Sequence, residues 1–291
     1  MRIGVADTTP RLLLLTPHPE LATPRRLIAA ARSLGVDAHV VRAAAPRLGT
    51  AELLASGRRL LTRPGSFSLV AILRAHRGWV RAGATPLQGR QALLDACDQW
   101  RTLVRSAAFG VPCVPARLIR HPSEIDAALD AFAPGPWFVK GRWGSQGTQV
   151  LFAAERAAAR RHALLFWGVG ASCLIEPDLR TTGRVERHLV VGGRVVASAI
   201  AHPAAGETRS NAHRGGRFEP IVPGSSPAAE VARRAVLALG LPLGAVDTIG
   251  VRAPRLLEVN ASPGIEALER ATGADLATTI LATLLGIDRA A

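Results

Sequence analysis

The 291-residue chain is long enough to bury cores in two or three subdomains, and its longest early apolar run, Leu12 to Leu15, is too short for a membrane span or a signal peptide. We therefore expect a soluble, cytoplasmic protein with no membrane attachment. The net charge of +14 would attract nucleic acid, but the basic residues are scattered and tyrosine is absent, so we do not expect direct nucleic-acid binding. Three widely spaced cysteines without a CxxC motif indicate neither a disulfide framework nor a zinc site.

The chain begins with the pattern of an open α/β domain. Apolar residues at 11–16 and 37–42 predict two strands. Between them, Thr23-Pro24 predicts the cap and first position of a helix that stops at Gly35. This β-α-β order is typical of a sheet covered by helices.

The rest of this first domain is less regular. Residues 43–66 are basic and predict no regular element, whereas SLVAILR at 68–74 predicts another buried strand. We expect the domain to end near residue 86.

The middle of the chain alternates between helical and extended patterns. A long helix is predicted from Leu87 to Phe109, and Ser123 with Asp126 resembles a capping box at the start of the next helix. The other predicted elements are strands at 116–119, 136–140, 148–152 and 172–176 and a helix at 154–166.

Lys140 is the only lysine among the 36 basic residues. A lysine retained in so arginine-rich a chain suggests a site that needs a compact ammonium group, although chance survival on the surface is the alternative. It ends a predicted strand and precedes a glycine-rich loop, whose backbone amides could bind phosphate while the lysine reaches phosphate oxygens. The loop residues concerned are Gly144, Ser145, Gln146 and Gly147.

The last part of the chain predicts a hairpin with a two-glycine turn at 192–193, then a basic loop and two helices at 227–239 and 275–285. The loop, ETRSNAHRGGRF, contains arginine, asparagine and histidine side chains that could bind a phosphoryl group and a carboxylate.

A second hairpin, formed by 244–251 and 255–260, carries three oxygen donors. Side chains alternate along a strand, so Glu258 and Asn260 should share one face, and Asp247 on the neighbouring strand could lie beside them. Carboxylate and amide oxygens are hard donors that suit Mg²⁺. A strand that simply ends in a turn is the alternative.

Two motifs resemble the RimK-like branch of the ATP-grasp superfamily, the α-L-glutamate ligases that modify ribosomal-protein or pterin-cofactor tails. They are EVNASPGIEALERATGADLA at 258–277 and RSNAHRGG at 209–216. The resemblance implies an α/β ATP-grasp fold in three parts. These are a Rossmann-like pre-ATP-grasp domain at 1–86, a central subdomain with a phosphate flap at 87–175, and a C-terminal subdomain with a metal platform at 176–291.

The activity implied is that of an ADP-forming ligase that activates a carboxylate as an acylphosphate and joins it to an amine, with L-glutamate as the amino acid. The acceptor stays open between a protein tail, a pterin-type cofactor and a small-molecule carboxylate. The oligomeric state is also open, with a homo-oligomer as one possibility. A non-catalytic nucleotide-binding protein with a degraded ATP site is the alternative. A basic RNA-binding module is a third hypothesis, and it would require no ATP.

The resemblance also assigns roles to residues. Asp247, Glu258 and Asn260 would hold two Mg²⁺ or Mn²⁺ ions. Lys140 and Arg209 would be catalytic. ATP would be bound by Lys140, Gly144, Ser145, Gln146, Gly147, Glu176, Arg187 and Asn211. The substrates would lie near Arg74, His213 and Arg214.

Three positions depart from the family pattern. Gln99 replaces a lysine that touches ATP phosphate in the relatives, and Val185 replaces an acidic residue, with Glu186 one place away. Gln149 stands where a further glycine is common. These changes would weaken ATP binding or alter its geometry, but they leave the metal platform intact.

Overall fold

The computed structural model describes residues 9–43, 51–65, 68–143, 149–204 and 216–288. They form two compact units. The first unit comprises Met1–Arg90, Gly264–Glu266 and Asp275–Ala291, and the second comprises Gln91–Pro263 and Ala267–Ala274. The predicted three-part division remains a prediction.

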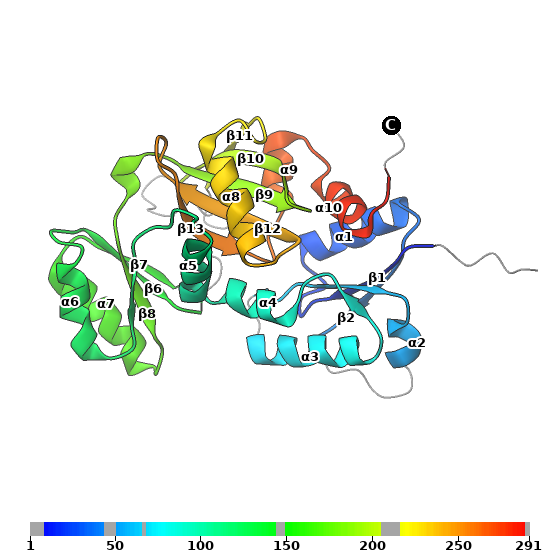
Figure 1. The fold of residues 1–291 in the computed structure, drawn as a ribbon, viewed down its shortest axis with the longest axis horizontal. Helices are drawn as coiled ribbons and strands as arrows, with labels where there is room; N and C mark the ends of the chain where they lie inside the picture. Colours follow the sequence, from blue (N-terminus) through cyan, green and yellow to red (C-terminus); the bar gives the residue numbers. More distant parts are fainter. Residues whose placement is uncertain (1–8, 44–50, 66–67, 144–148, 205–215, 289–291) are drawn as a thin grey trace, which may run out of the picture. The chain divides into compact units, whose positions relative to one another are not determined.

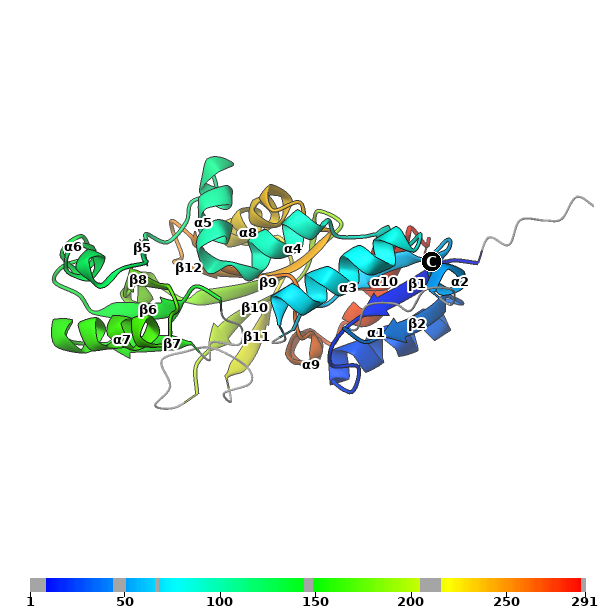
Figure 2. The same cartoon turned by 90° about the horizontal axis from the view of Figure 1, so that it is seen from below.

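The first unit contains a four-stranded parallel sheet in the order β2-β1-β3-β4. Its strands are β1 (Arg11–Leu15), β2 (Asp37–Val41), β3 (Arg59–Thr62) and β4 (Thr85–Pro86). Its helices are α1 (Ala22–Ser33), α2 (Ala51–Ala55), α3 (Leu69–Arg81) and α10 (Leu276–Leu285). Helices α1 and α3 lie on opposite faces of the sheet (Figures 1 and 2), so the predicted open α/β arrangement is confirmed.

Residues 68–74 are helical, so the predicted strand there is wrong. They begin α3, where Ser68 caps the helix by accepting a hydrogen bond from the Ala71 N–H at 3.4 Å. The buried positions of this helix follow helical spacing: Ile72, Leu73, Ala75, His76 and Trp79. A short apolar run cannot by itself distinguish a strand from a buried helix. The strand lies earlier, at β3, inside the stretch that the sequence predicted to be irregular.

The start of α1 also differs from its prediction. The helix begins at Ala22, so Thr23 and Pro24 lie in its first turn, and Leu21 caps it without a side-chain hydrogen bond. The Thr23 hydroxyl instead donates to Glu266 Oε1 at 2.5 Å.

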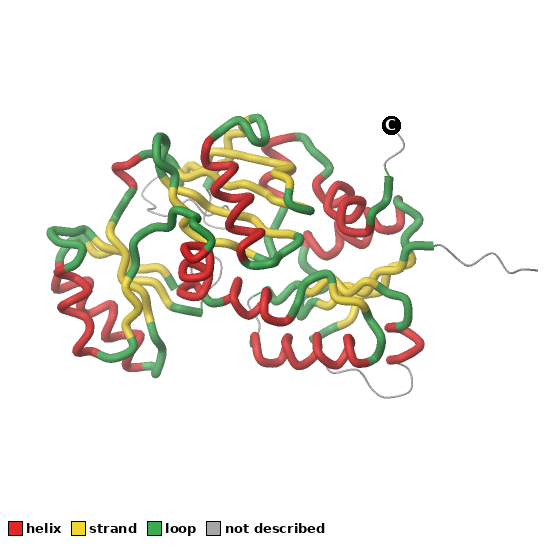
Figure 3. The backbone as a smooth tube through the Cα atoms, viewed as in Figure 1, coloured by secondary structure: helices red, strands yellow, loops and turns green. Residues whose placement is uncertain are grey.

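One sheet of the second unit is antiparallel, in the order β5-β8-β6-β7. Its strands are β5 (Arg117–Ile119), β6 (Trp137–Gly141), β7 (Val150–Ala153) and β8 (Cys173–Pro177). Helices α6 (Ile125–Asp130) and α7 (Arg156–Gly168) lie side by side along it (Figure 3). The predicted strands and helices of this region are therefore confirmed.

The other sheet of this unit is also antiparallel, in the order β11-β10-β9-β12-β13. Its strands are β9 (Val185–Val191), β10 (Arg194–His202), β11 (Arg217–Ile221), β12 (Leu243–Ile249) and β13 (Arg255–Asn260). Helix α8 (Pro227–Ala238) crosses one face of it (Figure 1), where valines of both layers form a core. Gly192 and Gly193 have φ of 55° and 76° in the β9–β10 turn, which confirms the two-glycine hairpin.

Two helix starts differ from prediction in the second unit. The expected long helix is divided at Asp98 into α4 (Arg90–Cys97) and α5 (Gln99–Ala108), because Asp98 is extended and caps α5. The capping box before α6 uses His121 and Glu124, which flank a short 3₁₀ turn at Pro122–Glu124, rather than Ser123 and Asp126. A second 3₁₀ turn lies at Arg180–Thr182, and α9 (Glu266–Thr272) follows β13.

The three cysteines are free thiols. Burial raises the pKa of Cys97 and Cys113 to about 11 and that of Cys173 to about 12. All three are therefore protonated and unreactive at neutral pH.

Among the described residues, no helix has the length and apolar character needed to span a membrane.

Candidate active site

Strands β12 and β13 bring two carboxylates together. Asp247 and Glu258 are directly opposite each other in the antiparallel register, so their side chains lie on the same face of the sheet. A β-bulge at the next position skips Leu257, so Thr248 pairs with Leu256, which is fully buried. The predicted pairing of Asp247 with Glu258 is confirmed.

Arg187 joins this pair from the neighbouring strand β9, where it is directly opposite Asp247. Its Nε and Nη2 donate to the two carboxylate oxygens of Asp247 at 2.6 and 2.5 Å, and Nη2 lies 4.0 Å from Glu258 Oε1. The guanidinium carbon is 5.4 Å from the centre of the Phe218 ring. The arginine is therefore held by a bidentate ion pair and an aromatic face.

The two carboxylates have opposite pKa shifts. Burial, followed by repulsion from Asp247, raises the pKa of Glu258 to about 7. Burial would also raise the pKa of Asp247, but the charge and hydrogen bonds of Arg187 hold it below 3.8. Asp247 is thus ionised at neutral pH, whereas Glu258 is near its midpoint and would gain from a further cation.

Asn260 is two residues beyond Glu258 on β13, and alternation places it on the same face. Its Oδ1 accepts a hydrogen bond from the Ser262 N–H at 2.8 Å, which fixes the turn after the strand. A carbonyl oxygen has a second lone pair, so this bond does not prevent metal ligation.

The three oxygen donors fit a divalent cation. Two carboxylates and an amide oxygen share one face of the sheet, and burial, followed by repulsion from Asp247, raises the pKa of Glu258. These are the ligands that Mg²⁺ and Mn²⁺ prefer. Ligation of this set is a proposal, developed below.

Lys140 lies on β6, and its Nζ is 2.5 Å from Glu176 Oε2 on the neighbouring strand β8. Both side chains are largely buried, with 11% and 5% of their surfaces exposed. Lys140 is therefore not a chance surface residue, and Glu176 is not an exposed linker carboxylate. The ammonium group also lies close enough to lower the pKa of Glu258 in part.

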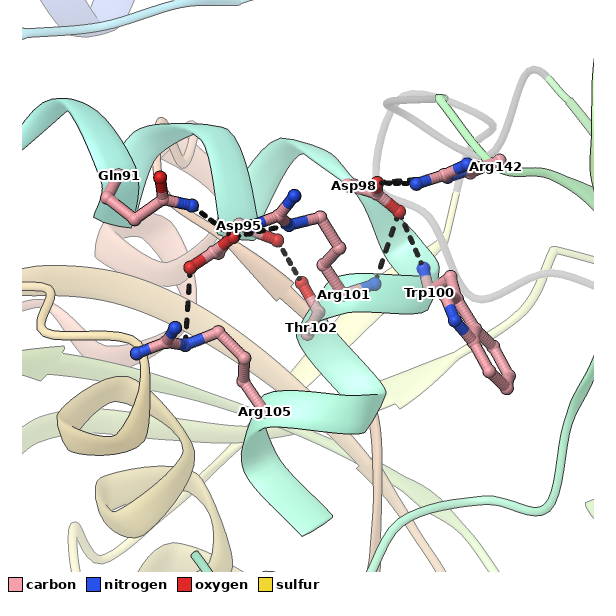
Figure 4. Close-up of polar contacts among 8 residues, drawn as sticks. All are labelled: Gln91, Asp95, Asp98, Trp100, Arg101, Thr102, Arg105 and Arg142. Carbon is pink, nitrogen blue, oxygen red and sulfur yellow. Dashed lines mark hydrogen bonds and ion pairs between the residues drawn. The ribbon is translucent and has the colours of Figure 1, made fainter. Parts of the chain in front are cut away.

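A second ion pair holds the end of β6 against the start of α5. Arg142 donates through Nε and Nη2 to Asp98 Oδ2 at 2.9 and 2.7 Å (Figure 4). Next to Asp98, the backbone N–H of Gln99 donates to the Arg142 carbonyl oxygen at 3.0 Å. The sequence analysis missed Arg142, because its partner is 44 residues away in the chain. Arg142 lies between the predicted strand that ends at Lys140 and the glycine-rich loop, and this position is the sequence feature from which it could have been found.

Other predicted site residues lie elsewhere in the chain or outside the described ranges. Arg74 is exposed on helix α3 of the first unit. Glu186 cannot replace the missing acidic residue at Val185, because it lies on the opposite face of β9 and bonds Arg184 and Ser226. The following predicted residues lie outside the described ranges: Gly144, Ser145, Gln146, Gly147, Arg209, Asn211, His213 and Arg214.

Comparison with known proteins places the chain in a family. The RimK-like ATP-grasp domain model matches residues 96–284. The chain is 30% identical over 288 residues to a probable alpha-L-glutamate ligase 1 of Shewanella amazonensis, with 94% of each chain covered. It is also 30% identical over 286 residues to a probable alpha-L-glutamate ligase of Thioalkalivibrio sulfidiphilus, covering 93% of this chain and 94% of that one.

Solved structures show the same fold at lower identity. D-cycloserine synthetase DcsG matches with a TM-score of 0.73 and 18% identity, covering 95% of this chain and 99% of that one. N5-carboxyaminoimidazole synthetase from Staphylococcus aureus, complexed with ADP, matches with a TM-score of 0.73 and 14% identity. The match covers 96% of this chain and 78% of that one.

The fold is thus that of the ATP-grasp ligases, enzymes that bind ATP with a divalent metal, form a carbon–nitrogen bond and release ADP. Within this class, the chain belongs to the RimK-like ATP-grasp family.

Proposed function

We propose that this ligase joins L-glutamate to the carboxylate of an acceptor through an acylphosphate. The observation that carries the proposal is the Asp247–Glu258 pair with Arg187 on one face of the sheet. This arrangement combines donors for a metal with a fixed cation for a phosphoryl group. The choice of L-glutamate rests on the similarity to the probable alpha-L-glutamate ligases.

The reaction needs two displacements. An oxygen of the acceptor carboxylate attacks the γ-phosphorus of ATP, the bond to the β-phosphate oxygen breaks, and ADP leaves. The α-amine of glutamate then attacks the carbonyl carbon of the acylphosphate, the carbon–oxygen bond breaks, and the product retains the new carbon–nitrogen bond. Inorganic phosphate leaves and the amine loses a proton.

Both displacements require positioning and neutralisation of phosphate charge rather than a nucleophilic side chain. In our proposal Lys140 and Arg187 bind phosphate oxygens as fixed cations, joined by Arg209 and Asn211 from the loop outside the described residues. Asp247, Glu258 and Asn260 would hold Mg²⁺ or Mn²⁺, as two ions, which would neutralise the charge of the phosphates. Asp247 keeps Arg187 in place through both of its oxygens.

We further propose that Arg63 in the first unit binds a substrate carboxylate, the role that the family resemblance implied for Arg74. Arg63 directly follows β3, and the strand order reverses between β1 and β3, which is where open α/β sheets bind ligands. Its side chain is only 5% exposed. Burial lowers its pKa to about 10, although Glu266 opposes the shift.

Arg74 supplies a matched control for Arg63, because both are arginines of the first unit and Arg74 is exposed on α3. We expect Arg63→Lys to raise the KM for glutamate or for the acceptor by about 10-fold or more, since a point charge cannot replace the bidentate fork. Arg74→Lys should leave both KM values unchanged. The opposite pattern would return the role to Arg74.

The proposed activity is tested by measuring ADP formation with Mg-ATP, L-glutamate and a panel of acceptors, together with the masses of the products. The panel contains a peptide with a carboxyl-terminal glutamate, a pterin-type cofactor with a carboxylate tail and small carboxylic acids. We expect ADP formation and a product heavier by one or more glutamate residues. ADP formation with another amino acid would correct the donor.

The second candidate is a nucleotide-binding protein without catalysis, and one observation favours it. Gln99 is neutral at a position where the family carries a lysine. ATP binding without turnover across the panel would support this candidate over the ligase.

A further inference from the structure

Arg142 lies directly beyond β6 and continues the strand in register. The Gly141–Cys173 pairing is followed by a hydrogen bond from the Arg142 N–H to the Ser172 carbonyl oxygen at 3.1 Å. Because side chains alternate along an extended chain, Arg142 is on the same face as Lys140, two residues earlier. The two cations therefore face the same side of this sheet.

Asp98 fixes the guanidinium group of Arg142 in one orientation. The carboxylate is 0% exposed, and its two oxygens have separate partners (Figure 4). Oδ2 accepts both bonds from Arg142, and Oδ1 accepts from the backbone N–H groups of Trp100 and Arg101 at 3.1 and 3.2 Å. Asp98 thus both caps α5 and holds the arginine at the end of this helix.

The arrangement places two cations on one face of the sheet, each paired with a carboxylate, Lys140 with Glu176 and Arg142 with Asp98. Helix α5 contributes the positive end of its dipole, and Arg142 and Lys140 contribute full charges. Arg142 binds Asp98 through the edge formed by Nε and Nη2, so the remaining edge of the guanidinium is directed away from the carboxylate. A quarter of the side chain is exposed, and its guanidinium carbon lies 5.1 Å from the centre of the Trp143 ring.

Gln99 makes this positive charge informative. It follows Asp98 at the first position of α5, and its backbone contacts the Arg142 carbonyl oxygen. Its own side chain carries no charge, so it cannot supply a cation at this point of the site. Arg142 lies beside it and can supply that cation.

We propose that Arg142 binds a phosphate group of the nucleotide and supplies the positive charge that Gln99 lacks. This inference rests on the proposed ATP-dependent function. It makes Arg142 a binding residue rather than only a structural partner of Asp98.

The test is a titration of wild type and Arg142→Gln with Mg-ATP and, separately, with adenosine, followed by calorimetry. We expect the affinity for Mg-ATP to fall about 10- to 100-fold, because a charge-assisted hydrogen bond is lost. The affinity for adenosine, which has no phosphate, should stay the same. A role confined to structure would lower both affinities.

A second variant tests the proposal more strictly by placing a positive charge at Gln99, the neighbour of Arg142. Gln99→Lys in the Arg142→Gln background should recover most of the lost ATP affinity. The matched control is Arg101→Gln on the same helix, which removes a half-exposed arginine that pairs with Asp95 and should leave ATP affinity unchanged. Arg142→Gln could lower the melting temperature, because the buried Asp98 carboxylate loses its partner. The double variant Arg142→Gln with Asp98→Asn removes that buried charge and keeps a side chain that can cap α5.

Equal affinity of wild type and Arg142→Gln for Mg-ATP would overturn the inference and leave the proposed function intact. A loss that Gln99→Lys does not restore would also overturn it. If the wild-type chain bound no nucleotide, the proposed function would fail together with the inference.

Discussion

Arg187 and Glu186 are neighbours on β9, but they point to opposite faces of the sheet and have different surroundings. On the face covered by α8, Glu186 is 2% exposed and accepts hydrogen bonds from Arg184 at 2.9 Å and from Ser226 at 2.6 Å. His188 is fully buried beside it, with Nδ1 2.9 Å from Ser198 Oγ. Glu186 is therefore well partnered on this face, while His188 Nε2 lies 3.5 Å from it without a hydrogen bond.

On the other face, charges of the same sign are placed together. Asp247 and Glu258 repel each other, and Arg187 compensates only the first of them closely. A protein that needed only stability would gain little from such a pair. The difference indicates that the α8 face maintains the fold, whereas the Asp247 face is arranged for a ligand.

The largest effect is expected from Lys140→Ala, which should lower ADP formation about 100- to 1,000-fold because a fixed cation is lost from the phosphate site. The variant also leaves the buried carboxylate of Glu176 without its partner, so we expect a lower melting temperature. Steady-state kinetics and thermal melting measure the two effects.

A double variant separates these two consequences. Lys140→Met with Glu176→Gln removes both buried charges and should restore the melting temperature without restoring turnover. Activity like that of the wild type in either variant would remove Lys140 from the mechanism.

On the α8 face, we expect Glu186→Ala to destabilise the protein by about 2 kcal/mol, because it removes the hydrogen bonds from Arg184 and Ser226 and the acidic neighbour of the buried His188 ring. Turnover per folded molecule should not change. Chemical denaturation and active-site titration check this prediction. A loss of turnover in fully folded protein would mean that the two faces are not functionally distinct.

The sequence was informative where local pattern determines geometry. Alternation along two strands sufficed to place Asp247 beside Glu258, and an apolar strand sufficed to deliver Lys140 into the protein. It was less informative where an apolar run had no clear period. Residues 68–74 could be strand or helix, and burial of one helical face decided the outcome.

Contacts between distant segments were beyond sequence reasoning. The ion pair between Asp98 and Arg142 depends on how α5 meets the end of β6. The break between α4 and α5 is local, because Asp98 caps the N–H groups of Trp100 and Arg101, and the predicted continuous helix overlooked that cap. The bulge at Leu257 reflects pairing with β12 rather than any local preference.

Glu258→Gln should change stability less than Glu186→Ala and in the opposite direction. It should stabilise the metal-free protein while abolishing activity. The pKa of Glu258 is raised from 4.5 to about 7, so the folded state holds a proton that the unfolded state has lost. That contribution to stability is complete below pH 4.5 and is lost as the pH rises through 7. At pH 8 we expect Glu258→Gln to be more stable than wild type by about 1 kcal/mol, since the side chain is partly exposed.

The gain should disappear at pH 4.5, where Glu258 is protonated in the wild type. Denaturant melts at pH 4.5 and pH 8, without divalent metal, make the comparison. Glu186→Gln on the opposite face is the control and should destabilise at pH 8. A destabilised Glu258→Gln at pH 8 would show that the carboxylate serves the fold rather than a ligand.

The smallest effect on stability is expected from the protonation of His188. It is best measured in the Glu258→Gln background, because the Glu258 carboxylate then no longer contributes to the pH dependence. Burial lowers the pKa of His188 below 6.5, although Glu186 and Asp247 act in the opposite direction. The folded state therefore binds its proton less readily than the unfolded state, and stability should decline as the pH falls below 6.5. His188→Leu in the same background removes the titrating group and should flatten this part of the pH profile. An unchanged slope would assign the acid sensitivity to other groups, and the α8 face would then contain no titrating centre of its own.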